Sequence, residues 1–431
     1  MINFKNHKLI FLFSIIFFSC SEEKSEFEPS DSQIPPNILL IIADDLGKDY
    51  TNGYIEGNLK PQIPAIDNLR LKGLQFNNFW SYPTCSPTRA SLITGKHAFK
   101  TNVLQPGDIL STNEKTLHSY IKEIPSNNYS NAVIGKWHLS GNNNMINPQT
   151  YGLDYFAGII GGGVQDYYNW RLNTNGAISN NREYITKTLT DMAIDWIKNQ
   201  NNPWFLWMSY NAPHTPFHTP PVQMHNQGSL PDYNDNLDPR PYYIAAIEAM
   251  DFQIGRLIQS IDASKINNTL IIFIGDNGTP GMVSQSPYGR QKSKGTLFQG
   301  GINNPMFMSG FGVNRLGIDN NLINTCDIFS TILEIAGSDQ YDSMDGKSFL
   351  ELLEIDYEHR KFQYSEMQNG TQNSKTISNG NYKLIRKPNT DLFFDLKNDP
   401  YENNNLGVLN LNSSEKSALN ELLSEIENIK N

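Results

Sequence analysis

The chain has 431 residues, of which 44 are acidic and 34 basic, and its formal net charge is −10. This length is ample for one large α/β domain and a smaller one. The acidic balance, without any basic stripe, argues against a nucleic acid as partner, but a local cluster of cations can still bind an anionic small molecule.

The N-terminus predicts an export signal. Two lysines precede the apolar run Leu9–Phe18, which is too short to span a bilayer comfortably. The run ends near Cys20, and this end resembles a bacterial lipoprotein cleavage site with Cys20 as the acylated residue, although ordinary signal cleavage stays open. We expect residues 21–36 to be a tether. The mature protein would then be an outer-membrane-anchored lipoprotein on the periplasmic side or at the cell surface.

Strand and helix patterns alternate over residues 37–337. Unbroken apolar runs are typical of strands in a parallel sheet covered on both faces. The predicted strands are Asn37–Ala43, Gln75–Trp80, Ser130–Gly135, Trp204–Tyr210, Thr269–Ile274 and Pro305–Gly310. The predicted helices are Pro64–Lys72, Asn113–Glu123, Thr186–Lys198, Pro241–Asp262 and Leu322–Gly337.

Two polar features interrupt this pattern. Residues 141–185 are rich in Gly, Asn and Tyr, and we interpret them as long loops near the mouth of a site. Glu248 and Asp251 lie within the long apolar-periodic helix 241–262, and we interpret them as its solvated face.

The tail has a different pattern. Short alternating runs at Phe362–Ser365, Asn381–Arg386 and Asp391–Leu396 predict a small antiparallel sheet. Residues 414–430 predict a closing helix. The expected fold is therefore α/β, with a large mixed, mostly parallel sheet flanked by helices and a smaller C-terminal antiparallel sheet and helix.

Four of the predicted strands deliver polar side chains at their carboxyl ends. Taken singly, each has a structural explanation: a solvated acid pair in a turn, a surface lysine, or a core histidine. Open parallel sheets build their sites along this edge, so that the four together favour a site. The side chains are Asp44, Asp45, Lys136, His138, His214, Asp276 and Asn277.

The acidic and amide side chains of this set supply only oxygen donors. Such donors suit a hard divalent ion, Ca²⁺ or Mg²⁺, rather than zinc. Adjacent buried carboxylates such as Asp44 and Asp45 are also costly without a cation.

The motif Cys85-Ser86-Pro87-Thr88-Arg89 lies after the second strand. Pro87 suits the first turn of a helix and Gly95 its end. Cys85 is therefore expected at a helix N-terminus, where free N–H groups favour an anion, with Arg89 one turn along. The alternative is a buried cysteine beside a structural arginine.

Cys-x-Pro-x-Arg resembles the signature of the type I, formylglycine-dependent sulfatases, which are arylsulfatase-like members of the alkaline phosphatase superfamily. Three further blocks are similar and stand in the same order, so that the resemblance covers roughly residues 37–410. These blocks are Gly135-Lys136-Trp137-His138-Leu139, Pro213-His214-Thr215-Pro216 and Lys294-Gly295 with Gly300-Gly301. The chain departs from the family at Asn303-Asn304, where relatives usually carry an arginine.

The resemblance implies a sulfuric ester hydrolase. In the family a maturation enzyme oxidises the cysteine to formylglycine (3-oxoalanine), whose hydrated aldehyde is the nucleophile. The implied metal ligands of the one divalent cation, Ca²⁺ in the first place and Mg²⁺ as the alternative, are Asp44, Asp45, modified Cys85, Asp276 and Asn277. The implied catalytic residues are Cys85, Arg89, Lys136, His138, His214 and Lys294.

The expected substrate is a sulfated small molecule or glycan, in the first place a sulfated carbohydrate. The specificity of the enzyme for this substrate would come from the 141–185 loops, His218 and the 283–293 loop, which contains Arg290 and Lys292. Two alternatives stay open: a phosphonate or phosphate ester hydrolase of the same superfamily, and a non-catalytic glycan-binding surface lipoprotein.

The predicted organisation has four parts, which are a signal peptide (1–20), a tether (21–36), a catalytic domain (37–340) and a C-terminal subdomain (341–431).

Overall fold

The structure is a computed structural model that describes residues 35–125, 128–142, 146–338, 340 and 344–429. The signal segment and most of the tether lie outside these residues. None of the helices in the described part of the chain has both the length and the apolar character that a bilayer crossing needs.

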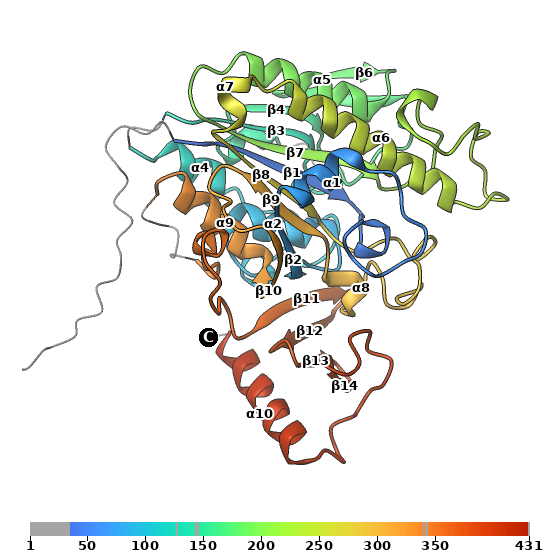
Figure 1. Cartoon of the computed structure of the whole chain (residues 1–431), viewed down its shortest axis with the longest axis vertical. Coiled ribbons are helices and arrows are strands. Elements are labelled where there is room, and N and C mark those ends of the chain that lie inside the picture. The colour runs from blue at the N-terminus through green and yellow to red at the C-terminus, as the bar shows by residue number, and fades with distance from the viewer. Residues whose placement is uncertain (1–34, 126–127, 143–145, 339, 341–343, 430–431) are drawn as a thin grey trace, which may run out of the picture. The chain divides into compact units, whose positions relative to one another are not determined.

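A ten-stranded mixed sheet forms the centre of the described chain (Figure 1). Its strands, in spatial order, are β10 (Gly317–Asn324), β2 (Gly73–Trp80), β9 (Met306–Gly310), β8 (Thr269–Gly275), β1 (Asn37–Asp44), β7 (Trp204–Pro213), β3 (Ser130–Lys136), β4 (Tyr155–Ile159), β5 (Trp170–Thr174) and β6 (Ala177–Asn181). The middle strands β8, β1, β7 and β3 are neighbours and all parallel. Their carboxyl ends therefore meet at one edge of the sheet.

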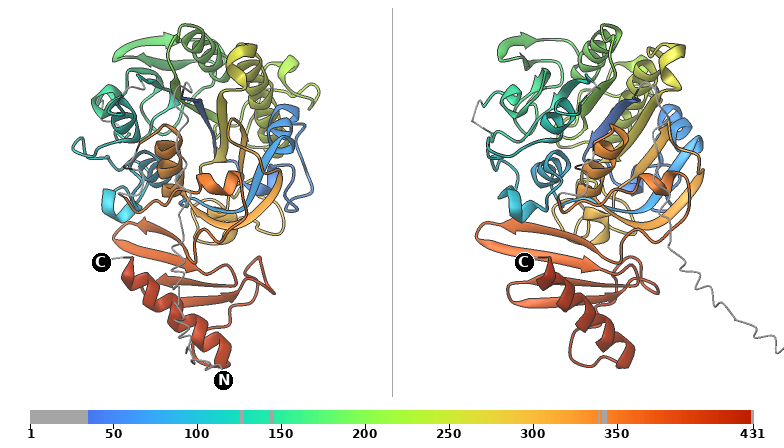
Figure 2. Two further views of the ribbon diagram at one scale, coloured as in Figure 1. Left: turned by 60° about the vertical axis from the view of Figure 1, so that its left-hand side comes forward. Right: turned by 90° about the vertical axis from the view of Figure 1, so that its left-hand side faces the viewer.

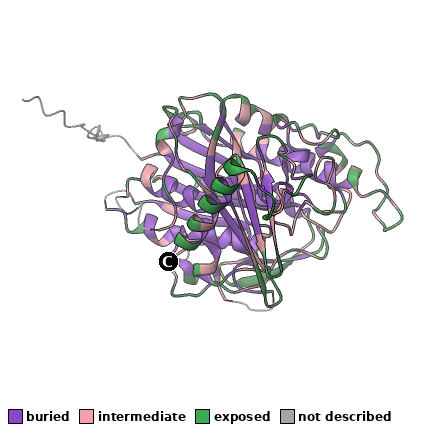
Figure 3. Cartoon of the chain, turned by 90° about the horizontal axis from the view of Figure 1, so that it is seen from below, coloured by how far each residue is buried: buried purple, intermediate pink, exposed green. Residues whose placement is uncertain are grey.

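Alternate residues of β1 face two separate hydrophobic cores, as the period of two in a strand requires. Leu39 and Ile41 pack into the core that the helices α1 (Pro64–Leu71), α5 (Ile185–Lys198) and α6 (Arg240–Gln259) cover. Ile38 and Leu40 pack on the opposite face, under α2 (Cys85–Thr94), α4 (Leu117–Lys122) and α9 (Thr325–Ile335). Figure 1 shows these helices on the two faces of the sheet, and Figure 3 shows that the strands in the middle of the molecule are buried.

The shorter elements lie in the connections. They are η1 (Lys48–Tyr50), α3 (Ala98–Thr101), η2 (Pro148–Tyr151), η3 (Val222–Met224), α7 (Ala263–Ile266), α8 (Gln299–Ile302) and η4 (Leu350–Leu353).

A second, four-stranded antiparallel sheet follows, in the order β11 (Gln363–Asn369), β12 (Gln372–Ser378), β13 (Tyr382–Lys387), β14 (Thr390–Asp395). Helix α10 (Ser413–Asn428) lies against this sheet in Figure 2, and Leu422 packs there with Leu384. Ile385 and Phe394 pack instead with Trp80 of the large sheet. The predicted fold class is thus confirmed, while the domain boundary predicted after residue 340 stays a prediction.

Three sequence predictions of elements are wrong in part. Residues 141–185 are not only loops, because β4, β5 and β6 extend the large sheet there. The predicted helix 322–337 begins as strand β10 and becomes helical only at Thr325, where Asn324 and Asp327 form a capping box. The helix predicted over 113–123 starts at Leu117, because Thr116 is its N-cap, and β12 was missed.

The interpretation of Glu248 and Asp251 as a solvated face is also wrong. Both carboxyl groups are buried. Asp251 accepts hydrogen bonds from the backbone N–H groups of Ala65 and Ile66 at 3.1 and 2.8 Å. These N–H groups lie in the first turn of α1, whose own N-cap residue offers no side-chain cap, so that α6 caps α1 from outside.

Candidate active site

The four strand ends predicted to share a site do meet. Asp44 ends β1, Lys136 ends β3, His214 follows β7 directly and Asp276 follows β8 directly. Since these four strands are parallel neighbours, their polar ends lie along one edge of the sheet.

Helix α2 brings Cys85 to this edge. The helix begins at Cys85, after an extended Thr84, and ends at Gly95 with a φ of 68°. A side chain at Gly95 would need this rare left-handed backbone and would also lie 2.5 Å from the ring of Phe329. The predicted start and stop of the helix are therefore confirmed, and the whole of α2 is buried.

Lys136 lies between Cys85 and Asp44. Its Nζ is 3.3 Å from Cys85 Sγ and 2.6 Å from Asp44 Oδ2. Burial alone would lower the pKa of Lys136, but the negative groups around it, Asp44 first, together outweigh burial and raise that pKa, so Lys136 keeps its charge. Burial raises the pKa of the Cys85 thiol, and Lys136 offsets only part of this. The plain thiol is thus held in its neutral form.

Asp45 is the second junction. Lys294 Nζ lies 2.5 Å from its carboxylate, Asn277 Nδ2 donates to it at 2.8 Å, and His214 Nε2 lies 3.7 Å away. Burial would raise the pKa of Asp45, yet the nearby cations, Lys294 first, hold it well below its usual range. Asp45 also has a φ of 71°, a conformation that costs free energy at a non-glycine residue.

Arg89 joins the helix to two strand ends. Its guanidinium donates to Asp276 Oδ2 and to the Lys136 carbonyl, both at 2.8 Å, and to Ser209 Oγ at 2.5 Å. Asp276 Oδ1 accepts from the backbone N–H of Asp45 at 3.1 Å. Burial and the neighbouring Asp44 raise the pKa of Asp276 to about 6, against the opposite pull of Arg89.

The two histidines differ in their surroundings. His138 is buried, and neither ring nitrogen has a hydrogen-bond partner among the described residues. Burial and the cations around it, Lys136 first, place the pKa of His138 well below its ordinary value. His214 donates from Nδ1 to the Thr215 carbonyl at 2.7 Å, which directs Nε2 toward Asp45.

The donor set fits a hard divalent cation. The ligand atoms of Asp44, Asp45 and Cys85 lie within 4.8 Å of one another. Asp44 Oδ1 and Asn277 Oδ1 are buried oxygens that accept no hydrogen bond from the described residues. Buried oxygen acceptors without donors are costly unless a cation binds them. The carboxylate and amide oxygens of this set favour Ca²⁺ or Mg²⁺, and Cys85 Sγ is the one sulfur atom beside them.

Several interactions that complete the site were not predicted from the sequence. Tyr243 of α6 donates to the Asp45 carbonyl at 2.5 Å, Thr88 to the Asp276 carbonyl at 2.8 Å, and Tyr167 to the His214 carbonyl at 2.6 Å. Gly162 lies against His138, since a Cβ there would be 2.5 Å from its Nε2. Ser209, which accepts from Arg89, could have been predicted as a site residue, because it is a polar side chain within the apolar run Trp204–Tyr210.

The residues predicted to set specificity do not form one group. His218 stacks on Tyr167 with ring centroids 3.6 Å apart, so it packs inside the loop. Lys292 donates to the carbonyls of Tyr401 and Glu402 at 2.8 and 3.0 Å and thus ties the 283–293 loop to the C-terminal part. Arg290 is exposed.

The positions Asn303-Asn304, where the family's arginine was missing, have a cation nearby. Lys48 donates to Asn303 Oδ1 at 2.7 Å and to the Asn77 carbonyl at 2.5 Å. Lys48 is buried, and burial lowers its pKa to about 8. It therefore lies inside the protein as a structural cation.

A mixed α/β sheet, with a buried helix that begins at Cys85 and a cluster of paired charges at its carboxyl edge, has the architecture of the alkaline phosphatase-like fold. The profile described as Sulfatase matches residues 36–338, and the profile described as N-sulphoglucosamine sulphohydrolase, C-terminal, matches residues 292–430. The chain belongs to the sulfatase family.

Individual relatives agree with this family. The ulvan-active sulfatase of Formosa agariphila is 26% identical over 424 residues, which cover 91% of this chain and 81% of that protein. The human N-acetylgalactosamine-6-sulfatase is 27% identical over 70% of this chain and 62% of its own length. Mouse arylsulfatase J is 26% identical over 74% of this chain, which spans only 56% of that relative.

Solved structures share the fold. The structure of Ps i-CgsB in complex with k-i-k-neocarrahexaose has a TM-score of 0.78 and 25% identity, covering 91% of this chain and 92% of that one. BT4656, in complex with D-glucosamine-2-N,6-O-disulfate, has a TM-score of 0.77 at 19% identity, covering 92% of this chain and 98% of that one. At that identity the likeness supports the fold alone.

Proposed function

We propose that this protein hydrolyses a sulfate ester of a carbohydrate, with Cys85 converted to formylglycine as the nucleophile. The observation that carries the proposal is the place of Cys85, in the first turn of a buried helix and 3.3 Å from Lys136. Relatives named for N-acetylgalactosamine-6-sulfate and ulvan, and a similar structure that holds a carrahexaose, support a carbohydrate as the substrate.

The fixed cations suit sulfuryl transfer. This reaction spreads negative charge over the oxygens around sulfur, so preorganised cations near the nucleophile stabilise its transition state. Lys294 and His214 have side chains that are 22% and 21% exposed, whereas Arg89 and Lys136 are fully buried. This difference in exposure supports an approach of the substrate to residue 85 past Lys294 and His214, and we assign these two to the sulfate and the leaving oxygen.

His138 is assigned the proton-accepting role beside residue 85. Ser86 Oγ donates to the His138 carbonyl at 3.0 Å, which ties this histidine to the first turn of α2. Its ring nitrogens have no partner among the described residues and are thus available to a neighbouring hydroxyl.

The divalent cation would be held by Asp44, Asp45, Asp276, Asn277 and residue 85. When bound, it supplies a Lewis acid that polarises a sulfate oxygen. Ca²⁺ is the proposed ion, with Mg²⁺ as the alternative, and elemental analysis of the purified protein separates the two.

The test is turnover of 4-nitrocatechol sulfate by protein produced together with a formylglycine-generating enzyme, followed by a screen of sulfated mono- and oligosaccharides. Wild-type protein should hydrolyse the aryl sulfate, and Cys85→Ala should not. Preference for a phosphonate or phosphate ester, or glycan binding without any turnover, would replace the proposal with one of the two alternatives.

We also propose that Cys20 carries the lipid that anchors the protein, facing the periplasm or the cell exterior. Cys20→Ala should move the protein from the membrane fraction to the soluble fraction. Wild-type protein that is already soluble after export would show ordinary signal cleavage instead.

A further inference from the structure

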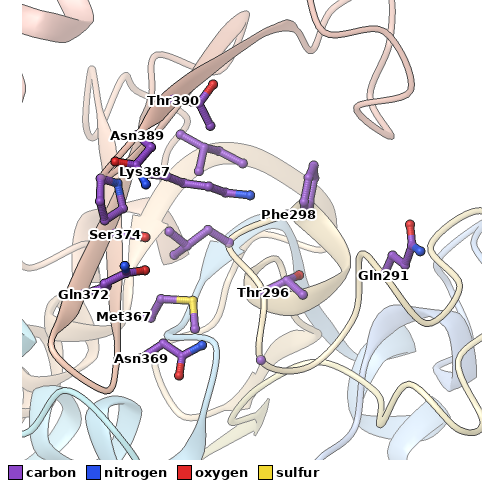
Figure 4. A pocket seen from close by; sticks show the side chains of 14 residues that line it. Gln291, Thr296, Phe298, Met367, Asn369, Gln372, Ser374, Lys387, Asn389 and Thr390 are labelled. Carbon is purple, nitrogen blue, oxygen red and sulfur yellow. The ribbon is translucent and has the colours of Figure 1, made fainter.

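A groove of about 420 Å³ begins at Gly295, the residue after Lys294. Figure 4 shows the side chains that line it. One wall is the segment 295–298, which directly follows Lys294. The N–H of Gly295 donates to the Pro83 carbonyl at 2.9 Å, two residues before Cys85. The other walls are the ends of the β11–β12 and β13–β14 hairpins. Both parts of the protein thus build the groove.

The lining combines an apolar floor with a polar, uncharged rim. Leu297, Phe298, Met367 and Ile385 supply the apolar surface. The amide and hydroxyl side chains are those of Gln291, Thr296, Asn369, Gln372, Ser374, Asn389 and Thr390. Amides and hydroxyls both donate and accept hydrogen bonds, and the half-buried ring of Phe298 offers a flat apolar surface.

The charge of the groove is opposite to that of the chain. None of its 14 lining residues is acidic, although the whole chain carries a net charge of −10. Its single cation, Lys387, is exposed and places Nζ 5.7 Å from the centroid of the Phe298 ring. In Figure 4 the Lys387 side chain extends toward Phe298 across the groove. An anionic ligand with many hydroxyl groups matches this lining.

We propose that this groove binds a second, non-reacting sugar residue of the substrate, one that carries a sulfate or carboxylate group next to Lys387. The inference rests on the proposed function, because it takes the ligand to be part of the same glycan as the ester being cleaved. The volume lies in the range of small-ligand sites, about 300–1,000 Å³. The protein would then prefer sulfated oligosaccharides to sulfated monosaccharides.

The binding test uses native electrophoresis in gels containing ι-carrageenan, ulvan or chondroitin sulfate, with neutral dextran as the uncharged control. The variant is Lys387→Glu. The matched control is Lys397→Glu, which makes the same charge change at another exposed lysine of the C-terminal part, outside the groove. Each protein is compared with its own mobility in a gel without polysaccharide.

Wild-type protein and Lys397→Glu should be retarded by at least one anionic polysaccharide, and Lys387→Glu by none. A wild-type protein that none of them retards would overturn the inference, and so would equal loss of retardation in both variants.

A kinetic arm separates this inference from the proposed function. On a tetrasaccharide from the retarding polysaccharide, Lys387→Glu should lower kcat/KM by about 10-fold, while turnover of 4-nitrocatechol sulfate stays unchanged. Equal losses on both substrates would overturn the groove assignment. Absence of aryl sulfate turnover in wild-type protein would instead contradict the proposed function, and the retardation result would still decide the groove.

Discussion

Two groups of buried carboxylates in this protein have different kinds of partner. At the carboxyl edge of the sheet, Asp45 and Asp276 face the side-chain cations of Lys294 and Arg89. On helix α6, Glu248 and Asp251 face backbone N–H groups of segments far away in the chain.

The two kinds of partner indicate two different roles, one in catalysis and one in holding the fold together. A carboxylate paired with a side-chain cation keeps charge at the site, where it can also act on an incoming metal ion or substrate. A carboxylate that satisfies backbone N–H groups holds two segments of chain together, and its loss leaves those donors unpaired. We therefore expect substitutions in the first region to remove activity and substitutions in the second to remove stability.

The largest expected effect is at Asp45. Asp45→Asn keeps the shape of the side chain but removes the charge that Lys294, His214 and the cation share. Turnover of 4-nitrocatechol sulfate should fall by about 10³-fold or more, with loss of the bound metal in elemental analysis. The variant should still unfold cooperatively, because the partly exposed Lys294 can be hydrated. Wild-type activity in Asp45→Asn would contradict the catalytic role assigned to the carboxylates at the edge of the sheet.

The second test is Asp251→Asn. Ala65 and Ile66 donate to different oxygens of Asp251, and in asparagine one of these atoms becomes an NH₂ donor. We therefore expect a loss of about 1–3 kcal/mol in the free energy of unfolding, measured by urea denaturation. The kcat of the folded variant should equal that of the wild type. Asp195→Asn, an exposed acid on α5, is the matched control and should change neither quantity. A fall in kcat without a fall in the free energy of unfolding would contradict the structural role assigned to Asp251.

The third test concerns His118, which is buried against Phe205 and Trp207 and has no charged partner among the described residues. Burial lowers its pKa to about 3. The unfolded chain binds this proton below about pH 6.5 and the folded chain does not, so stability is lost as the pH falls, by about 1.4 kcal/mol per unit.

His118→Leu should therefore recover about 2 kcal/mol, relative to wild type, between about pH 7.5 and pH 5. Denaturation curves at the two pH values measure this difference, and any fixed effect of the substitution cancels between them. Parallel losses in both proteins would show that His118 titrates normally.

The smallest effects are expected in the 283–293 loop. Arg290→Ala should lower kcat/KM on a sulfated sugar by about 10-fold or less and leave the aryl sulfate unaffected. Lys292→Ala should instead lower the thermal midpoint, because its ammonium ties this loop to Tyr401 and Glu402. If Arg290→Ala lowered the thermal midpoint and Lys292→Ala lowered kcat/KM, then Lys292 would contact the substrate and Arg290 would stabilise the loop.

Tyr168 belongs to the same test. It is 37% exposed and donates to the Thr219 carbonyl at 2.9 Å. Tyr168→Ala should change the ranking among sulfated sugars more than it changes aryl sulfate turnover.

The sequence was sufficient for the strands that carry the site. Runs such as Asn37–Ala43 are apolar throughout, which is the mark of a central parallel strand, and their polar ends stand out against it. It was insufficient for β6, whose residues are nearly all exposed and whose one strand partner in the described part of the chain is β5. Such strands form through pairing and leave little pattern in the sequence.

The residues around the site were harder to predict than the site itself. Glu248 and Asp251 stand three apart on a helix, a spacing that usually indicates a solvent face. Only the tertiary structure shows that α1 and the loop around Asn226 cover them. Tyr243 likewise fits the apolar positions of the helical pattern. Its hydroxyl contacts the Asp45 carbonyl only because the helix packs on the sheet.

The most direct test of the central claim is the chemical state of residue 85 measured beside turnover. Peptide mass spectrometry gives the fraction of Cys85 whose CH₂–SH has become CHO, in preparations made with different amounts of maturation enzyme. The account predicts that kcat on 4-nitrocatechol sulfate rises in proportion to this fraction and extrapolates to zero without it. Full activity in protein whose Cys85 is entirely an unmodified thiol would contradict it.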